Sequence, residues 1–523
     1  MNRASSIKNI EENILWDIII IGGGATGLGT AVDAASRGYK VLLLEQYDFA
    51  KGTSSRSTKL VHGGVRYLQQ GNIKLIKEAL RERGLLLQNA PHVCEPIQFV
   101  IPVYSWFKKW YYAAGLKLYD FISGKYSLGK TSMLTAESVK KFLPTIDDRK
   151  LNGGILYFDG QFDDARLAIN LAQTAVNYGA TIINYCKVTG FIEEQNKISG
   201  VSCLDSIGGN NYQLKSTVVI NATGVFTDDI LKMAAPGHQP IIKVSQGIHI
   251  VIDKKYFPGN MGLMIPSTSD GRVLFAVPWH NKVVVGTTDT AINTANIEPL
   301  AQQQEINFVL EHINQYLQIN ISQKNILSVF AGLRPLIKIS GKSNTALLPR
   351  DHTILVNENG LVTITGGKWT TYRIMAEQVI NKAIKNSELE FKKCVTANLK
   401  IQGYQQKNKL DHHHHLCCYG ADAENVEDLV NANPSLGQRI HPRYFFIKAQ
   451  IVWAVQKEMA ITVEDFLARR IRLLFLDAKA AIESANVVAE IMATELNKDQ
   501  QWIQQQVEDF NKLAEGYLML RIK

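Results

Sequence analysis

The stretch from residue 17 to residue 45 constrains the fold more than any other part of the sequence. It reads DIIIIGGGATGLGTAVDAASRGYKVLLLE, in which Gly22, Gly24 and Gly27 have G-x-G-x-x-G spacing. An isoleucine run precedes the glycines, a helical stretch follows them, and a second apolar run leads directly to Glu45. A strand, a glycine turn, a helix, a strand and an acid in this order are typical of a βαβ unit that binds a dinucleotide.

The glycines and the acid have separate roles in such a unit. The first glycine lets the chain turn, the second lets the backbone approach a pyrophosphate, and the third lets the helix pack close to the strand. The positive helix N-terminus favours the phosphates, and the acid accepts a hydrogen bond from the adenosine ribose. The alternative interpretation is an ordinary glycine-rich loop. The cofactor-binding residues predicted here are Gly22, Gly24, Ala25, Thr26, Gly27 and Glu45.

Length and charge limit the class of protein. At 523 residues the chain is too long for one core, so two or three domains are expected. A hydrophobic content of 46% and a charged content of 20% are typical of a globular enzyme. The formal net charge of +9 favours an anionic partner, which could be nucleic acid, an anionic membrane face or a phosphorylated small molecule.

The cysteines and the N-terminus predict the compartment. The six cysteines include no C-x-x-C pair and no repeated spacing, which argues against a disulfide framework or a zinc site. The first sixteen residues contain charges of both signs and no apolar core, so no secretory signal is expected. No run approaches the roughly twenty apolar residues that span a bilayer. We therefore expect a cytoplasmic protein.

A polar segment, TSSRSTKLVHGGVRYL, follows the ribose-binding acid closely. Small hydroxyl side chains and glycines suit a loop laid along a polar ligand better than a packed core, although a solvated surface loop is the alternative. The further cofactor-binding residues predicted in this segment are Thr53, Ser54, Ser55, Lys59, Leu60, His62, Gly63 and Gly64.

Two later turns also follow apolar strands. STVVINATG places a small-residue turn at the end of a strand, and TITGGKWTT places a glycine pair between a strand and a helix. Ligands of open α/β sheets bind at the carboxyl ends of strands. The helix that starts near Lys368 would also stabilise negative charge on a bound ring. The cofactor-binding residues predicted in these turns are Ala222, Thr223, Gly224, Gly367, Lys368, Trp369 and Thr370.

Together, these segments resemble the flavin-contacting regions of FAD-dependent glycerol-3-phosphate dehydrogenases, a branch of the glutathione-reductase-like and D-amino-acid-oxidase-like flavoproteins. The resemblance extends over nearly the whole chain and is strongest over residues 17–87 and 331–377. FAD is favoured over NAD because its flavin is large enough to need all three segments. The resemblance implies an α/β fold with a discontinuous, glutathione-reductase-like Rossmann domain, an antiparallel β-sheet substrate domain and a C-terminal α-helical domain.

The domain boundaries follow from where the chain returns to the first sheet. The late glycine pair belongs with the opening fingerprint, so the cofactor domain is expected to be discontinuous. Beyond about residue 390 the sequence becomes polar and then helical. The predicted boundaries are 14–90, 151–240 and 331–390 for the FAD-binding domain, 91–150 and 241–330 for the substrate-binding domain, and 400–523 for the C-terminal helical domain.

Four cations and a tyrosine are candidates for binding the substrate. A guanidinium beside a turn can hold a phosphate through two parallel hydrogen bonds, although a single such arginine is more often a surface ion pair. The resemblance implies that these residues line one glycerol phosphate pocket. The predicted substrate-binding residues are Arg66, Tyr67, Arg334, Arg350 and Lys368.

Oxidation of a secondary alcohol needs a base for the hydroxyl proton. His249, within the alternating run KVSQGIHIVI, is the first candidate, because a neutral imidazole is available near pH 7. A lone histidine in a strand is more often structural. Arg334 and Lys368 could instead polarise the hydroxyl and stabilise the developing alkoxide. The identity of the base stays open among these predicted catalytic residues.

The resemblance implies oxidation of sn-glycerol 3-phosphate to dihydroxyacetone phosphate by hydride transfer to FAD, with a quinone as the electron acceptor. The alternatives are a glycerol-3-phosphate oxidase that uses oxygen and releases hydrogen peroxide, or a related amino-acid or hydroxy-acid flavin oxidase. A nucleic-acid-binding flavoprotein is disfavoured because no known RNA module is present. A quinone acceptor would bring the protein to the inner face of the cytoplasmic membrane as a peripheral protein. A homodimer is left open.

Three other segments have two interpretations each. The aromatic and lysine-rich run over residues 103–122 fits a membrane interface or, somewhat better, a packed helix of the second domain. His412 to His415 could suggest a metal site, but a polar linker explains the run better. The basic cluster at Arg469, Arg470 and Arg472 is most simply a solvated helix face.

Overall fold

A computed structural model of the chain describes residues 1–12, 15–64, 72–338, 351–411 and 414–519. Several residues singled out above lie outside these ranges, and their predicted roles therefore stay predictions. These residues are Arg66, Tyr67, Arg350, His412 and His413.

The first sheet has a parallel core. Five of its strands run parallel, with β1 at the centre between β2 and β10, and the order along the sheet is β17-β18-β10-β1-β2-β7. A β-meander extends it where β9 pairs with β10 and β8 with β9. The bounds are β1 Leu15–Ile21, β2 Val41–Leu44, β7 Thr181–Ile183, β8 Cys186–Glu194, β9 Lys197–Asp205, β10 Asn211–Asn221, β17 His352–Val356 and β18 Val362–Gly366.

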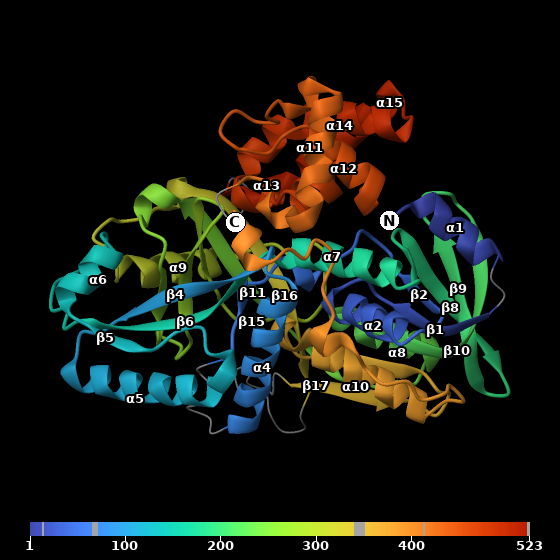
Figure 1. Cartoon of the computed structure of the whole chain (residues 1–523), viewed down its shortest axis with the longest axis horizontal. Helices are drawn as coiled ribbons and strands as arrows, with labels where there is room; N and C mark the ends of the chain where they lie inside the picture. The colour runs from blue at the N-terminus through green and yellow to red at the C-terminus, as the bar shows by residue number, and fades with distance from the viewer. Residues whose placement is uncertain (13–14, 65–71, 339–350, 412–413, 520–523) are drawn as a thin grey trace.

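The central strands read as continuous apolar runs because both faces of the sheet are covered. Alternate residues of β1 and β2 pack beneath the helices on one face, and the remaining residues pack against the meander and α8 on the other. Figure 1 shows α2, α7 and α10 lying side by side along the sheet. The bounds are α1 Arg3–Glu12, α2 Ala25–Ser36, α7 Asp164–Asn177, α8 Thr227–Ala234 and α10 Tyr372–Lys385.

The glycine fingerprint forms the predicted strand, turn and helix. A Cβ at Gly27 would lie 1.8 Å from the carbonyl oxygen of Gly22, and a Cβ at Gly29 would lie 2.7 Å from the ring of Tyr372 in α10. These two glycines therefore let α2 approach both the turn before it and its neighbouring helix. Gly22 itself has φ of +109°, a conformation that L side chains rarely adopt.

The second sheet is built mainly from antiparallel pairs, with one parallel pair between β4 and β12. Its order is β15-β11-β14-β13-β12-β4-β6-β3, with β16 added to β11 and β5 to β6. The bounds are β3 Leu60–Val61, β4 Cys94–Pro102, β5 Ser132–Leu134, β6 Gly154–Phe162, β11 Ile242–Asp253, β12 Gly262–Ile265, β13 Leu274–Trp279, β14 Lys282–Gly286, β15 Thr290–Ala291 and β16 Ile326–Ile337.

Two long strands differ from the predicted domain boundaries. β6 and β16 pair in the second sheet, whereas the segments 151–240 and 331–390 had been assigned to the FAD-binding domain. β6 and β16 belong to the second sheet because each pairs along its length with a long strand of that sheet. β6 aligns with nine residues of β4, and β16 aligns with almost all of β11. The chain therefore passes back to the first sheet only after each of these strands has ended.

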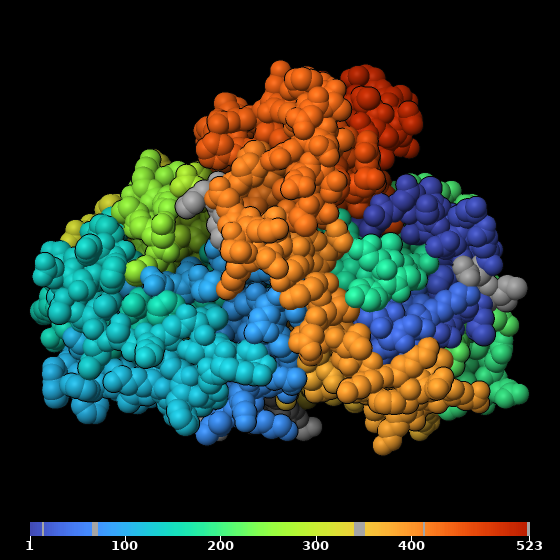
Figure 2. All heavy atoms as spheres, viewed as in Figure 1, coloured from blue at the N-terminus to red at the C-terminus, as the bar shows by residue number. Residues whose placement is uncertain are grey.

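The C-terminal helices form a separate lobe. Figure 1 places them above the junction between the two sheets, and Figure 2 shows them as a raised lobe over both. Their core includes Val251, Trp279 and Phe330 of the second sheet, so the lobe is packed onto the sheet. The predicted three-part fold class is therefore confirmed. The bounds are α11 Ala423–Ala432, α12 Ala449–Glu458, the π-helical turn η12 Asp465–Arg470, α13 Leu473–Leu476, α14 Ala478–Leu496 and α15 Gln500–Ala514.

The prediction of a solvated basic face at Arg469, Arg470 and Arg472 is wrong. All three side chains are buried, with exposed fractions of 2% or less. Their guanidinium groups form ion pairs with carboxylates of the FAD-binding region, including Asp48 and Asp164. The basic cluster is therefore part of the contact between the C-terminal lobe and the rest of the molecule.

The aromatic run forms α5 (Trp106–Ser123), which has one buried and one exposed side. Ala113 and Leu116 pack against strands of the second sheet. On the other side, Trp106, Phe107 and Phe121 have exposed fractions of 67%, 75% and 83%. Figure 1 shows α5 at the edge of the molecule opposite the C-terminal lobe. The remaining helices are α4 Ile73–Asn89, α6 Ala136–Phe142 and α9 Gln303–Asn314.

Candidate active site and cofactor cavity

A cavity of about 510 Å³ lies at the carboxyl ends of β1, β2, β10 and β18. This is the edge at which open α/β sheets bind ligands. Segments from all three parts of the predicted FAD-binding domain meet around it. The predicted cofactor residues that line the cavity are Gly22, Gly24, Ala25, Thr26, Glu45, Thr53, Ser54, Ala222, Thr223, Gly224, Gly367, Lys368 and Trp369.

Glu45 lies at the end of β2, where the ribose-binding acid is expected. Its two carboxylate oxygens accept hydrogen bonds from the amides of Gly23, at 2.6 Å, and Tyr47, at 2.8 Å. Burial raises the pKa of Glu45, while these two amides act to lower it. The amides fix the carboxylate at the cavity wall, and its remaining lone pairs can accept a hydrogen bond from a ligand.

The start of α2 and the NATG turn enclose the middle of the cavity. Gly24 is the residue before α2, and the amide of Ala25 donates to Ser54 Oγ at 2.9 Å. A Cβ at Gly22 would lie 2.8 Å from the carbonyl oxygen of Ala222. The backbone of the glycine turn can therefore approach both the NATG turn and a ligand closely.

The late glycine pair shapes the other end of the cavity. Gly366 and Gly367 have φ of +81° and +77°, so the chain turns sharply after β18 into η7 (Trp369–Thr371). The indole Nε1 of Trp369 donates to the carbonyl oxygen of Ser54 at 2.9 Å. This bond joins two lining segments that are more than three hundred residues apart in the sequence.

The remaining predicted cofactor residues lie behind the lining. The amide of His62 donates to Thr370 Oγ1 at 3.2 Å, and the amide of Gly63 donates to Tyr119 Oη at 2.8 Å. Lys59 is fully buried, with its Nζ 2.7 Å from Asp164 Oδ2. The residues that are not among those lining the cavity are Gly27, Ser55, Lys59, Leu60, His62, Gly63, Gly64 and Thr370.

Several lining segments were not identified from the sequence, among them the start of β8 and part of α8. Cys186, Lys187 and Val188 begin β8, directly after β7 ends, and Asp229 and Met233 belong to α8. The signal that could have identified the start of β8 is that it follows β7, which is a strand of the parallel sheet. Residues that follow the carboxyl end of any parallel strand face this edge, so the turn after β7 could have been included.

The cavity fits a dinucleotide such as FAD on its geometry. It has a carboxylate acceptor at Glu45, a helix N-terminus at Ala25, and glycine backbone at the lining residues Gly22 and Gly24. These are the groups that hold a ribose and a pyrophosphate. The glycine pair and Lys368 lie at the far end of the same cavity, with room for a larger ring system.

His249 is fixed in β11 by three neighbours. One ring nitrogen, Nε2, lies 2.8 Å from Thr58 Oγ1, and the ring stacks on Phe330 with centroids 5.0 Å apart. A Cβ at Gly286 would lie 2.3 Å from the ring, so only glycine fits opposite it. Burial, Arg334 and Lys59 lower the pKa of His249 well below its usual value, so the imidazole is neutral near pH 7.

Arg334 lies on the same face of the sheet as His249. Arg334 pairs with Ser245 and His249 pairs with Phe330, and the row between them consists of Gly247 and Gly332. Directly opposed residues of an antiparallel pair point to one face, and residues two apart share it. A Cβ at Gly247 would lie 2.2 Å from Arg334 Nη2, so this glycine lets the guanidinium lie across the strand towards His249.

The guanidinium of Arg334 is oriented by two further contacts. Its Nη2 donates to Thr287 Oγ1 at 2.9 Å, and its Nη1 lies 3.6 Å from Asp289 Oδ1. The next residue in β16, Pro335, lines the cavity, as does Lys368. Of the predicted catalytic residues, the structure brings His249 and Arg334 together and places Lys368 at the cavity wall.

The described part of the chain contains no group of three or more His, Cys, Asp and Glu side chains arranged to hold a metal ion. In the histidine run, His414 Nε2 lies 3.6 Å from Glu427 Oε1, and the ring of His415 is tilted against that of His414, with centroids 4.6 Å apart.

Comparison with family models gives two matches along the chain. Residues 17–373 match the model described as FAD dependent oxidoreductase. Residues 363–503 match the model described as the C-terminal domain of alpha-glycerophosphate oxidase. The first match begins at the fingerprint and ends just beyond the late glycine pair, so it includes every segment that encloses the cavity.

Relatives and solved structures agree with these models. The mitochondrial glycerol-3-phosphate dehydrogenase of Rattus norvegicus is 37% identical over 95% of this chain and 72% of its own length, and that of Homo sapiens is 37% identical over 98% and 75%. The glycerol-3-phosphate dehydrogenase of Bacillus halodurans, solved with FAD, aligns with a TM-score of 0.81 at 27% identity over 100% of this chain and 98% of its own. The chain belongs to the family of FAD-dependent glycerol-3-phosphate dehydrogenases.

Proposed function

We propose that the protein oxidises sn-glycerol 3-phosphate to dihydroxyacetone phosphate by hydride transfer to FAD, with the electrons passed on to a quinone. The observation that carries the proposal is the pairing of a neutral His249 with Arg334 on one face of the second sheet, where the residue after Arg334, Pro335, lines the cavity. FAD, when bound, supplies an acceptor for the two electrons of the alcohol. The names of the relatives support the substrate.

The cations of the site recognise the substrate. Arg334 is held by Thr287 and Asp289, so its planar guanidinium is oriented before substrate arrives. An oriented guanidinium can bind a phosphate or polarise a hydroxyl through directional hydrogen bonds. Lys368 adds a second positive charge at the cavity wall. Arg66, Tyr67 and Arg350 complete the predicted substrate-binding set.

His249 accepts the hydroxyl proton in this proposal. The ring is neutral because burial and the nearby cations disfavour its protonated form. Thr58 holds Nε2, while Nδ1 is buried and has no hydrogen-bond partner among the described side chains. A neutral imidazole has one lone pair that can take a proton, and Arg334 stabilises the developing alkoxide as that proton leaves.

Substrate and acceptor can be tested separately. Anaerobic glycerol 3-phosphate should bleach the flavin absorbance of the purified protein, whereas amino acids and lactate should not. Bleaching by an amino acid instead would identify an amino-acid oxidase. In air, the quinone reaction predicts little hydrogen peroxide and rapid reduction of an added ubiquinone analogue. Stoichiometric peroxide with slow quinone reduction would identify the oxidase.

We also propose that the protein acts at the inner face of the cytoplasmic membrane and contacts the lipid through α5. None of the described helices is long and apolar enough to cross a membrane. The exposed side of α5 instead presents Trp106, Phe107 and Phe121 beside Lys108 and Lys117. Aromatic rings and cations are both favoured at a lipid interface, especially an anionic one.

The membrane contact predicts binding to anionic vesicles. Replacing Trp106 and Phe107 together with serine should reduce cosedimentation with phosphatidylglycerol vesicles severalfold, because exposed apolar surface is lost. Phe445, which is also exposed but lies in the C-terminal lobe, provides the matched control. Equal binding of the α5 variant and the wild type would show that another surface contacts the lipid.

A further inference from the structure

The segment that follows β2 lines the cofactor cavity without belonging to a long helix or strand. Residues 45–47 and 50–54 form part of the cavity wall, and the only helical element within this stretch is the single turn η1 (Thr53–Ser55). Segments with so little internal structure take their shape from the contacts around them. The segment over residues 46–56, here called the cavity loop, receives most of its charged contacts from the C-terminal lobe.

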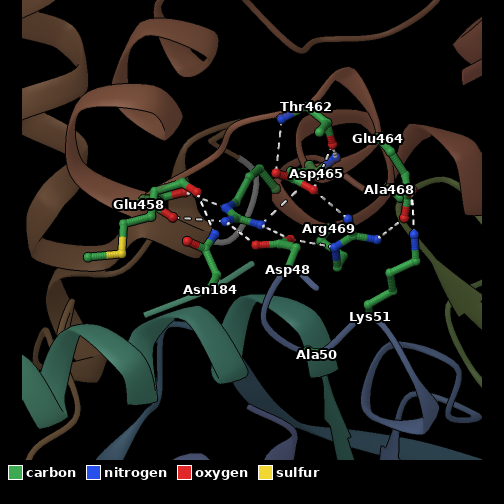
Figure 3. A network of polar contacts seen from close by, with 12 residues as sticks. Asp48, Ala50, Lys51, Asn184, Glu458, Thr462, Glu464, Asp465, Ala468 and Arg469 are labelled. Atoms are coloured by element: carbon green, nitrogen blue, oxygen red, sulfur yellow. Dashed lines mark hydrogen bonds and ion pairs between the residues drawn. The ribbon is translucent and has the colours of Figure 1, made fainter. Parts of the chain in front are cut away.

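Asp48 is the centre of these contacts. Its carboxylate accepts a hydrogen bond from Arg469 Nε at 2.5 Å and two from Arg470, at 2.7 and 2.9 Å. All three side chains are buried. Figure 3 shows Asp48 on the FAD-binding side facing Arg469 on the C-terminal side. Burial alone would raise the pKa of Asp48, but Arg470 and Arg469 lower it to about 2.

Two more contacts hold the loop on either side of the cavity wall. Lys51 Nζ lies 2.7 Å from Glu464 Oε2, and Glu464 also accepts from Arg469. Arg472 Nη2 donates to the carbonyl oxygen of Ser55 at 2.8 Å. The lobe therefore contacts the loop at Asp48, between the two lining stretches, at the lining residue Lys51, and at Ser55, directly after the second stretch.

The loop in turn contacts the other cavity walls. Ser54 Oγ accepts from the amide of Ala25 at the start of α2, and the carbonyl oxygen of Ser54 accepts from Trp369 Nε1. Thr53 Oγ1 donates to the carbonyl oxygen of Leu333 at 2.8 Å. A displacement of the loop would therefore move the groups that enclose the pyrophosphate and the late glycine turn.

Because these charges are buried, the conformation of the cavity loop depends on contact between Asp48 and the two arginines of the C-terminal lobe. If Arg469 and Arg470 were withdrawn, the carboxylate of Asp48 would be left buried without a compensating charge. A buried charge without a partner is strongly unfavourable, so the loop would rearrange to bring Asp48 to water. The conformation that lines the cavity is thus stable only while the lobe is docked.

We propose that Arg469 and Arg470 are positioning residues for FAD, which hold the cavity loop in its binding conformation and link docking of the C-terminal lobe to cofactor affinity. The proposal rests on FAD occupying the cavity described above. Neither arginine is among the residues that line that cavity. Because linkage is reciprocal, FAD must stabilise the docked lobe as much as the docked lobe favours FAD.

The first test measures FAD affinity in the full-length protein. Apoprotein is titrated with FAD and followed by flavin fluorescence, for the wild type, Arg470→Gln, Arg470→Lys and Glu464→Gln. Arg439→Gln is the matched control, since Arg439 belongs to the same lobe and its exposed side chain contacts Pro442 and Phe445. We expect Kd to rise at least tenfold in Arg470→Gln and less in Glu464→Gln. Excess FAD should restore turnover.

The second test measures the reciprocal effect, first in the wild type and then in Arg470→Lys. FAD should slow proteolysis of the C-terminal lobe of wild-type apoprotein, and this protection should shrink in Arg470→Lys. Wild-type affinity in both folded Arg470 variants, or equal weakening in Arg439→Gln, would overturn the proposal. Failure of the wild type to bind FAD would instead contradict the assignment of the cavity. If Arg470→Gln does not fold, Arg470→Lys and Glu464→Gln decide the outcome.

Discussion

At the scale of single residues, the site depends on a histidine whose protonation is controlled by its surroundings. His249 is buried against Phe330 and held by Thr58, and the charges of Arg334 and Lys59 disfavour its protonated form. A buried imidazole with such a lowered pKa stays unprotonated over the whole physiological pH range, as the proposed base must be before it accepts a proton. The sequence identified His249 as a candidate base, but its neutrality depends on neighbours from two distant segments, residues 58–59 and β16.

Replacing His249 with asparagine should slow flavin reduction by glycerol 3-phosphate about 10²- to 10⁴-fold, the usual contribution of a general base. Anaerobic stopped-flow absorbance measures this rate directly. The control is His312→Asn, a buried histidine of α9 that contacts Ser269 and Phe308. Reduction of His249→Asn at the wild-type rate would exclude His249 as the base and favour Arg334 and Lys368.

A second buried histidine predicts how stability changes with pH. Burial lowers the pKa of His92 to about 4, against 6.5 for an exposed histidine. The unfolded chain therefore binds a proton at His92 below pH 6.5 that the folded chain does not bind until near pH 4. Stability is full above pH 6.5 and should fall by about 1.4 kcal/mol per pH unit between these values.

Urea unfolding at pH 7, 6 and 5 checks this slope. Since carboxylates and His249 also titrate, the informative quantity is the difference between the wild type and His92→Gln, which no longer titrates at this position. The free energy of unfolding of the variant should fall less steeply as the pH decreases. Parallel pH profiles would show that His92 is protonated equally in both states.

At the scale of helices and strands, the sequence predicted those elements whose formation depends on the local spacing of residues. The fingerprint follows from glycine positions and apolar runs, and the structure has it. Thr462 and Asp465 form a reciprocal cap, since Thr462 Oγ1 accepts from the amide of Asp465 and Asp465 accepts from that of Thr462. The helix that follows this cap is only the π-helical turn η12, and Arg472 then adopts φ of +65°. The sequence did not reveal this.

Gly27→Ala tests whether FAD binding requires the close packing of α2 on the glycine turn. The added Cβ would lie 1.8 Å from the carbonyl oxygen of Gly22, so α2 must move away from the turn and the cavity must open. We expect FAD affinity to fall at least a hundredfold, measured by fluorescence titration of the apoprotein. Gly115→Ala in α5 is the control, because a Cβ there would meet no described atom within 4 Å beyond its own helix. Unchanged affinity in Gly27→Ala would place the pyrophosphate elsewhere.

At the scale of the whole molecule, the sequence could not reveal which charges would be buried together. Arg469 and Arg470 have the composition of a solvated helix face, and their partner Asp48 lies more than four hundred residues away. Local patterns contain no information about such pairs. Local patterns also did not reveal that His249 and Arg334 lie close together. Their proximity depends on the pair Gly247 and Gly332, which lies between them in β11 and β16.

The pair formed by Arg166 in α7 and Glu458 in α12 predicts how strongly the lobe is attached. Both side chains are buried, with oxygen–nitrogen distances of 2.5 and 2.9 Å. Glu458→Gln should lower the free energy of unfolding by about 3–5 kcal/mol, because Arg166 is left without its full compensating charge. Denaturant titration measures the change.

Glu194→Gln is the control for this substitution. Glu194 pairs with Lys215 on the surface, where both side chains are more than half exposed. An exposed pair contributes about 1 kcal/mol or less. Equal losses for the two variants would mean that burial of the Arg166 pair adds nothing to stability.

The cofactor cavity also has a consequence for how the protein is made. Its walls come from segments that begin at Ile21 and end at Trp369, so the cavity is incomplete until most of the chain has been synthesised. At usual rates of synthesis, roughly 20 to 70 s separate the first wall from the last. FAD is therefore a late ligand of the nascent chain, and its capture reports that these distant wall segments have been assembled correctly.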